Sequence, residues 1–250
     1  MCSGSKRGCS KMIQQFIDQA PIFFTLNNGL YWLRALVTTL SMALIGCVVG
    51  FIFGFVLVYF RTSPIPWLLP LRALLIAYVE IFRRIPFLVL TFLILFASRG
   101  FGFQLSLFWV ACVTIVLIAT AYIAEIIRAG IEAVHRNQWE CADVMNFSRA
   151  RTMLYVIVPQ SWVFIIPPAF SYFVMFIKET SLTSQIGTME LMSAGKYFNS
   201  IGISPIMAYG TCLLLYFALS YPLTLLGRRI EVRLKNRFKG NMATLSASDQ

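Results

Sequence analysis

Four long runs without a charged side chain constrain the fold of this chain more than any other feature. They cover residues 35–60, 100–124, 152–177 and 197–227. Each run exceeds the roughly 20 residues that a helix needs to cross about 30 Å of hydrocarbon. Because backbone polar groups in lipid must be satisfied within the protein, only helices and closed barrels cross a bilayer. The runs lack the alternation of barrel strands, so the sequence predicts an all-α membrane protein.

The composition agrees with a membrane protein and argues against a nucleic-acid partner. Charged residues make up only 12% of the chain and hydrophobic residues 58%, whereas a soluble domain carries about 25% charged residues. The formal net charge of +11 comes largely from basic residues that flank the apolar runs. We therefore attribute this charge to orientation in the membrane and to contact with anionic membrane lipids.

The chain is predicted to form one membrane domain with two short ends. Residues 1–30 form an N-terminal lead-in, residues 31–230 the transmembrane domain, and residues 231–250 a basic cytoplasmic tail. The apolar segment 67–82 contains Arg72 and Glu80, whose insertion into lipid is costly, so we expect it to lie along the membrane surface. About five spans then remain, at residues 33–60, 86–98, 105–124, 158–177 and 206–227.

The distribution of Lys and Arg orients the predicted spans. Six of these residues lie in the segment 228–239 and four in the segment 125–155. Two spans separate the segments, so both lie on one side, which the positive-inside rule makes cytoplasmic. With five spans the N-terminus is outside, although its three basic residues favour the inside. A sixth span at residues 67–82 would place them inside, so five and six spans both stay open.

Three glycines recur at every fourth position of the first span. Gly46, Gly50 and Gly54 therefore share one face of the predicted helix. Small residues allow the backbone of a second helix to approach closely within a membrane. We expect this face to pack against another span.

The polar segment 125–158 is much longer than a simple connection between spans needs. Within it, residues 138–145 are predicted to form a short helix with Ala142 and Met145 on one face. Asn146 follows this helix. The position after a helix end favours a residue in the left-handed conformation, which Asn tolerates next best to Gly. Ser148 is then placed to cap the following helix. Such a helix can carry force from a cytoplasmic partner, although an ordinary amphipathic loop helix fits the pattern equally well.

A spaced motif in this segment resembles one in a known family. It reads Glu140-Cys141-Ala142, three residues, Asn146, nine residues, and Val156-x-Val158-Pro159. This pattern resembles the EAA loop of ATP-binding-cassette importer permeases, which has Glu-Ala-Ala, three residues, Gly, nine residues and Ile-x-Leu-Pro. The spacing is kept throughout. Four positions depart from the pattern with residues of similar size or backbone tolerance: Cys141, Asn146, Val156 and Val158.

Three further motifs resemble the polar amino acid branch of that family. Tyr78-Val-Glu80-Ile-Phe-Arg83-Arg-Ile-Pro86 is similar to its Tyr-Val-Glu-Leu-Phe-Arg-Gly-Thr-Pro, and Lys178-Glu179-Thr180-Ser181-Leu182 to its Lys-Asp-Thr-Ser-Leu. The run from Gly130-Ile131 to Gln138-Trp139-Glu140 resembles the same branch. Together the motifs cover about residues 30–230 in the order of the family.

The resemblance implies the membrane subunit of an importer for a polar amino acid such as glutamine, arginine or histidine. Such a subunit lies in the bacterial inner membrane, pairs with a like or unlike second permease chain, and receives its substrate from an extracytoplasmic solute-binding protein. A dimer of separate ATPase subunits binds the ATP, so no cofactor is expected on this chain. The resemblance implies that the short helix couples to the ATPase through Trp139, Glu140, Cys141, Ala142, Met145 and Asn146.

A second set of residues is a candidate for the translocation path. Lys178 and Glu179 are charges near the end of a span, and intramembrane charges tend to be functional. They are adjacent, however, so they point in different directions, and structural pairing or an interfacial position is the favoured interpretation. Thr180 and Ser181 either offer hydroxyl groups to the path or bond to their own backbone.

The sequence gives no support to an enzyme. The phosphate-binding pattern G-x-x-x-x-G-K-[ST] is absent, so this chain is not expected to hydrolyse ATP. Glu125, Glu132 and Asp143 are the only acids that form a candidate set, and their spacing matches no metal site, so neither catalytic nor metal-binding residues are expected. The alternative function is a secondary amino acid transporter or channel driven by an ion gradient, but the internal repeat frequent in such proteins is not visible.

Overall fold

The computed structural model describes residues 18–21, 23, 25–62 and 66–248. Within these ranges all regular structure is helical and no strand occurs. Most of the predicted lead-in, residues 1–30, lies outside the described residues, and the first long helix, α2, already begins at Leu26 and ends at Thr62. The all-α prediction is confirmed for the described part of the chain.

Four helical segments are long and apolar enough to cross a membrane. The first two are α2 and α5 (Leu107–Glu132). The third, Arg149–Ile186, is continuous and contains α8 (Val158–Glu179), and the fourth is the part of α10 (Pro205–Ser248) that ends at Leu234. Short segments complete the third span: α7 (Arg149–Arg151), the π-helix η2 (Thr152–Ile157) and the 3-10 helix η3 (Thr180–Ile186). Four of the five predicted spans are thus present.

The remaining span is broken into two short helices. The 3-10 turn η1 (Pro66–Leu68) leads into α3 (Leu69–Phe82), which is followed by α4 (Phe87–Gly100), and the two helices are bent by 114°. Each has 14 residues and is about 21 Å long, too short to cross a bilayer alone. The span predicted at residues 86–98 is therefore incomplete by itself. Four spans are counted without α3 and α4, and five if the two helices together form one bent span. The position of α3 along the membrane surface stays a prediction.

The break has a local cause at Pro86. This residue has extended backbone angles, φ −60° and ψ 134°, and directly precedes α4. A proline disfavours the helical conformation in the residue before it, here Ile85, and its nitrogen cannot donate to a preceding carbonyl. The chain turns over residues 83–86, and the Arg84 N–H donates to the Ile81 carbonyl at 3.0 Å. We call residues 83–86 the α3–α4 bend.

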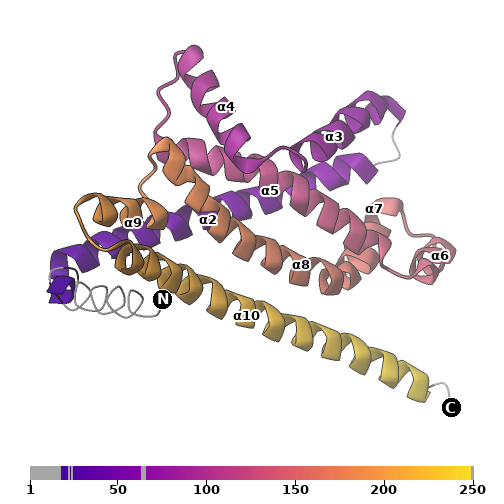
Figure 1. Cartoon of the computed structure of the whole chain (residues 1–250). Coiled ribbons are helices and arrows are strands. Elements are labelled where there is room, and N and C mark those ends of the chain that lie inside the picture. The colour runs from indigo at the N-terminus through magenta and orange to yellow at the C-terminus, as the bar shows by residue number, and fades with distance from the viewer. Residues whose placement is uncertain (1–17, 22, 24, 63–65, 249–250) are drawn as a thin grey trace, which may run out of the picture.

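The three glycines of α2 lie against α5, as their spacing predicts. In Figure 1 the two helices cross in the middle of the molecule, where they are in contact. A Cβ atom added to Gly50 would lie 2.7 Å from the Ala119 Cβ and 3.1 Å from the Thr120 backbone nitrogen. Gly46 and Gly54 meet Ile115 and Ile123 in the same way. The two backbones therefore approach more closely than any larger side chain would allow.

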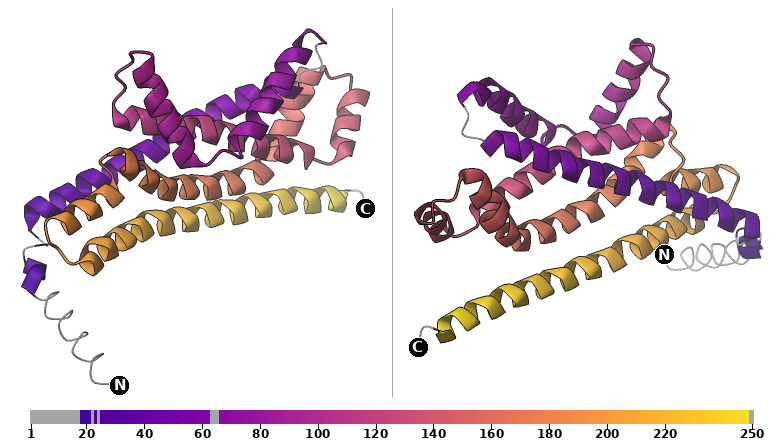
Figure 2. Two further views of the ribbon diagram at one scale, coloured as in Figure 1. Left: turned by 45° about the horizontal axis from the view of Figure 1, so that its top comes forward. Right: turned by 180° about the vertical axis from the view of Figure 1, so that it is seen from behind.

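Helix α5 is the centre of the bundle. It contacts α2, α3, α4 and α8, and most of its length is buried. Helix α10 follows α8 along the outside of the bundle, and the two views of Figure 2 show the same arrangement. Two short helices, α6 (Arg136–Val144) and α9 (Leu191–Ser200), lie at opposite ends of the bundle. If α6 is cytoplasmic, as the charge distribution predicts, α9 is extracytoplasmic.

The contact between α2 and α5 leads to a first prediction. We expect Gly50→Ala to lower the stability of the protein by about 1–3 kcal/mol, because overpacking forces well-packed neighbours apart. The melting temperature of the purified protein in detergent measures this effect. Gly210→Ala in α10 is the matched control, since a Cβ atom there meets nothing within 4 Å. Equal melting temperatures for the two variants would contradict the proposed role of the glycine contact.

Candidate coupling site

The short helix predicted at residues 138–145 is present as α6, which runs from Arg136 to Val144. The polar loop before it is shorter than expected, because α5 continues to Glu132. The interpretation of residues 125–132 as a loop was therefore wrong. On one face of α5, Arg128 forms ion pairs with both Glu125 and Glu132. Ile127 and Ile131 lie on another face and are buried. The charges marked a helix face, not a loop.

Helix α6 is attached to the bundle by one side. Ala142 is buried, and the half-buried Trp139 packs against a cluster of buried apolar residues from α2, α3, α5 and α8. The Gln160 side-chain amide in α8 donates to the Gln138 side-chain oxygen at 3.0 Å. At the start of the helix, the Nδ1 atom of His135 accepts a hydrogen bond from the Asn137 N–H at 3.3 Å. A displacement of α6 therefore reaches both α5 and α8.

The end of α6 depends on a left-handed residue. Asn146 has φ 56°, the positive value expected from the sequence. Its N–H donates to the Asp143 carbonyl at 3.0 Å, and the Phe147 N–H donates to the Ala142 carbonyl at 3.0 Å. These two bonds form a Schellman motif, which satisfies carbonyl groups that the helix leaves open. Ser148 precedes α7 as predicted, but its side chain makes no cap hydrogen bond.

The outward side of α6 is exposed. Val144 is 88% exposed and Met145 66% exposed, and Glu140 and Cys141 are exposed as well. Met145 follows Ala142 by three residues but is exposed, so the predicted shared face does not extend beyond the end of the helix at Val144. Of the six predicted coupling residues, Trp139 and Ala142 hold the helix to the bundle. The other four form the surface that a partner would meet.

Glu140, an exposed acid of α6, forms only one weak ion pair. Its Oε1 atom lies 3.0 Å from the Nε atom of Arg136, one turn earlier, and both side chains are largely in solvent. Exposed pairs of this kind contribute roughly 0–1 kcal/mol. Glu140 can therefore exchange Arg136 for a partner's basic group at little cost.

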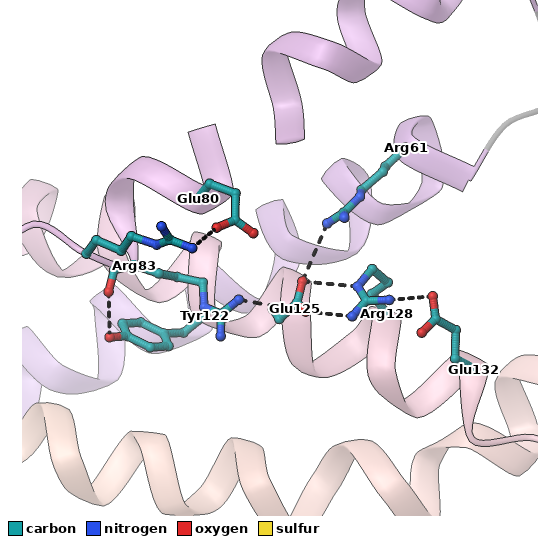
Figure 3. A network of polar contacts seen from close by, with 8 residues as sticks. Arg61, Glu80, Arg83, Tyr122, Glu125, Arg128 and Glu132 are labelled. Atoms are coloured by element: carbon teal, nitrogen blue, oxygen red, sulfur yellow. Dashed lines mark hydrogen bonds and ion pairs between the residues drawn. The ribbon is translucent and has the colours of Figure 1, made fainter. Parts of the chain in front are cut away.

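A network of ion pairs lies where α5 approaches α6 (Figure 3). Glu125 makes two contacts to Arg128, at 2.6 Å and 3.1 Å. Arg61 at the end of α2 lies 3.5 Å from the same carboxylate, and Arg83 in the α3–α4 bend lies 3.7 Å from it. Arg128 also pairs with Glu132. These acids serve as partners of arginines, and the described residues contain no group of His, Cys, Asp and Glu able to hold a metal ion.

Comparison with known proteins identifies the family. Residues 46–236 match the model of the binding-protein-dependent transport system inner membrane component. The chain belongs to this family. It is accordingly a multi-pass membrane permease, as the motifs of the sequence imply.

Curated relatives of the permease include several amino acid transport proteins. It is 31% identical over 198 residues to the probable glutamine ABC transporter permease protein GlnP of Bacillus subtilis (strain 168), covering 78% of this chain and 89% of that protein. It is 30% identical over 210 residues to the L-cystine transport system permease protein TcyB of the same organism, covering 84% of this chain and 86% of that protein.

Solved structures agree with this assignment. A chain in the crystal structure of an amino acid ABC transporter with histidines matches with a TM-score of 0.77 and 27% identity, over 83% of this chain and 96% of that one. A chain of the inward-facing MetNI methionine ABC transporter matches with a TM-score of 0.72 at 20% identity, over 84% of this chain and 99% of that one. The second likeness concerns the fold alone.

The predicted translocation residues lie together at the end of α8 remote from α6. Lys178 is exposed, Glu179 is half-buried, and neither forms an ion pair with another described residue. The buried Thr180 donates its hydroxyl to the Ile177 carbonyl at 2.7 Å. Ser181 is partly exposed next to it. The structure thus places these residues without assigning them a substrate, and their role stays a prediction.

Glu190 is the polar residue that the sequence interpretation missed. It is fully buried at the start of α9 and accepts hydrogen bonds from the Met192 and Ser193 N–H groups at 2.8 Å and 2.7 Å. The Tyr216 hydroxyl of α10 donates to the same carboxylate at 2.6 Å. Burial raises the pKa of Glu190, and the three hydrogen bonds act in the opposite direction. The sequence signal is an acid three residues after Gly187, which could have indicated a helix start in residues 178–204, between the last two predicted spans.

Helix α9 is tied to the bundle on three sides. Besides the bond from Tyr216, the Leu191 N–H donates to the Thr39 hydroxyl of α2 at 3.2 Å. The Lys196 ammonium donates to the Ser184 hydroxyl of η3 at 2.9 Å. These bonds close the end of the bundle opposite α6.

The Schellman motif of α6 leads to a second prediction. Asn146→Gly should leave the helix intact, since Gly adopts positive φ readily, whereas Asn146→Val should strain it by at least about 1–2 kcal/mol. Amide hydrogen exchange in residues 136–144 measures the change, and about tenfold faster exchange is expected for the valine variant only. Equal exchange in both variants would show that the left-handed residue does not hold the helix end.

The buried carboxylate leads to a third prediction. Tyr216→Phe removes one donor from Glu190 without changing the ring, and should lower the stability by about 1.5–3 kcal/mol. Thermal unfolding in detergent is the measurement. Tyr221→Phe, an exposed ring of the same helix, is the control and should unfold as the unaltered protein does. A melting temperature unchanged in Tyr216→Phe would mean that this bond does not hold α9.

Proposed function

We propose that this chain is the membrane subunit of an ATP-binding-cassette importer that brings a polar amino acid, such as glutamine, arginine or histidine, into a bacterial cell. In this proposal it lies in the inner membrane, pairs with a second permease chain, and receives its substrate from an extracytoplasmic solute-binding protein. A dimer of separate ATPase subunits binds and hydrolyses the ATP. The chain itself then carries no cofactor and catalyses no reaction.

The observation that carries the proposal is the exposed short helix α6 in a chain of this family. The helix offers Glu140, Cys141, Val144 and Met145 to a partner, while Trp139 and Ala142 join it to the bundle. An exposed apolar pair beside charged groups is typical of a contact surface with a protein partner. The amino acid substrates named for several relatives support the substrate class.

The attachment of α6 explains how a partner would act on the spans. A push on its outward face is transmitted through Trp139 and the Gln138–Gln160 bond to α8, and along the chain to α5. These helices run towards the opposite end of the bundle, where Lys178, Glu179, Thr180 and Ser181 lie. We propose that this end of α8 borders the translocation path, because charged and hydroxyl groups there can replace water around a zwitterionic substrate.

The proposal predicts that α6 is required for binding of the ATPase. Glu140→Lys reverses an exposed charge without disturbing the inward face, and the copurified ATPase should fall at least about tenfold, the effect of losing a close charge pair at an interface. Quantitative copurification from membranes measures the change, together with ATP-dependent uptake of labelled glutamine and arginine.

The control for this experiment is Glu80→Gln. This acid is also exposed and pairs with an arginine one turn away, Arg84, but it lies on α3. It should retain the ATPase at the level of the unaltered chain. Uptake that continues after ATP depletion and follows an ion gradient would overturn the proposed function.

A further inference from the structure

The α3–α4 bend is tied to successive positions along α5. The Tyr78 hydroxyl in α3 donates to the Leu117 carbonyl at 2.7 Å. The Tyr122 hydroxyl in α5 donates to the Arg83 carbonyl at 3.1 Å. One turn further along α5, the Glu125 carboxylate lies 3.7 Å from the Nη1 atom of Arg83. The break in the span is therefore held by specific polar contacts to α5 (Figure 3).

Glu125 connects this bend with the end of α2. The guanidinium groups of Arg61, Arg83 and Arg128 reach the single carboxylate from α2, from the bend and from α5 itself. The side chain of Arg61 is 18% exposed, that of Glu125 22% and that of Arg83 33%. Partial burial makes such pairs stronger than pairs in free solvent. Glu125 thus links three parts of the chain that are distant in the sequence: the end of α2, the α3–α4 bend and α5.

The three arginines need the negative charge of Glu125 at this position. Without it, guanidinium groups of like charge would face one another, because Glu132 reaches only Arg128. The Nε atom of Arg83 is buried and has no hydrogen-bond partner among the described residues. Its ring contact to Tyr122, at 5.8 Å from the centroid, is a weak substitute. Loss of the carboxylate would therefore remove the side-chain link between the bend and the end of α2, although the Tyr122 hydroxyl would still hold the Arg83 carbonyl.

The position of Glu125 links this network to α6. It precedes Glu132, the last residue of α5, by two helical turns, and α6 begins at Arg136. The intervening helix is about 10 Å long and packs through buried residues such as Ile127 and Ile131. Close-packed interiors have low compressibility and transmit strain, so a displacement of α6 would reach Glu125 through this part of α5.

We propose that Glu125 is the residue that transmits the movement of α6 to the α3–α4 bend and to the end of α2, acting through Arg83 and Arg61. Glu125 is a positioning residue and touches no substrate. The inference rests on the proposed function, because it assumes that an ATPase moves α6. It goes beyond that function by naming the contact that converts the movement into a change in the broken span.

The test uses the complete transporter, with the ATPase that copurifies with the chain and its solute-binding protein, in lipid vesicles. ATP hydrolysis and uptake of labelled L-glutamine and L-arginine are measured together, and their ratio gives the uptake per ATP. Glu125→Gln should keep ATPase binding and hydrolysis within about twofold but lower the uptake per ATP at least about fivefold. Glu132→Gln, which removes a 62% exposed partner of Arg128 only, should leave the ratio unchanged.

A second variant covers the case in which Glu125→Gln fails to fold. Arg83→Gln leaves the pair between Glu125 and Arg128 intact and removes only the contact to the bend, and it should lower the ratio in the same way. The double variant should be no worse than the more severe single one, because both changes remove the same contact. An unchanged ratio in Arg83→Gln, or an equal loss in Glu132→Gln, would overturn the inference.

A hydrogen-exchange measurement that needs no amino acid substrate separates this inference from the proposed function. Hydrogen exchange in residues 83–86 should change when ATP is added to the unaltered complex and should no longer respond in Arg83→Gln or Glu125→Gln. A response that persists in both variants rejects the transmitting role of Glu125. Absence of ATP-dependent amino acid uptake by the unaltered complex rejects the proposed function instead, whatever the exchange at the bend shows.

Discussion

The close contact between the backbones of α2 and α5 is the constraint on which the rest of the structure depends. Gly46, Gly50 and Gly54 add no side chain of α2 to the contact, so α5 packs closely against α2 and is buried along most of its length. Packing of small residues takes the place in lipid of the hydrophobic effect that drives helices together in water. Because α5 is held in this way, it can carry α6 at one end and support the bend of the broken span in its middle.

The polar residues of the permease differ in burial and bonding between the α9 end and the α6 end of the bundle. At the end near α9, Glu190 is fully buried and satisfied by three donors, which gives a rigid closure. On the outward side of α6, the polar groups are exposed and engaged in weak pairs such as that of Arg136 and Glu140. Between the two, Glu125 has partners from three elements. Strong bonds hold the fold, and weak ones leave a surface for a partner.

The sequence predicted some elements well because their signal is local. An uncharged run long enough to cross a bilayer has few alternatives to a helix, and four spans follow from this alone. The end of α6 at Asn146 was predictable for the same reason, since few residues adopt positive φ. The last turns of α5 were missed, because charged residues such as Glu125 were taken as signs of a loop, and helix α9 was not predicted. The carboxylates of Glu125 and Glu190 instead find partners far away in the chain: an ion pair with Arg61 for Glu125 and a hydrogen bond from Tyr216 for Glu190.

By itself, the sequence determined that the chain crosses a membrane, which family it resembles, where α6 lies and which glycines permit close packing. These properties depend on composition and on spacing along one helix, and both can be read without knowledge of the neighbours. Only the tertiary structure decided that α3 and α4 are bent by 114°, that Met145 is exposed and that Glu125 meets three arginines. Each of these depends on the distance between groups far apart in the chain, which is set by how the helices pack.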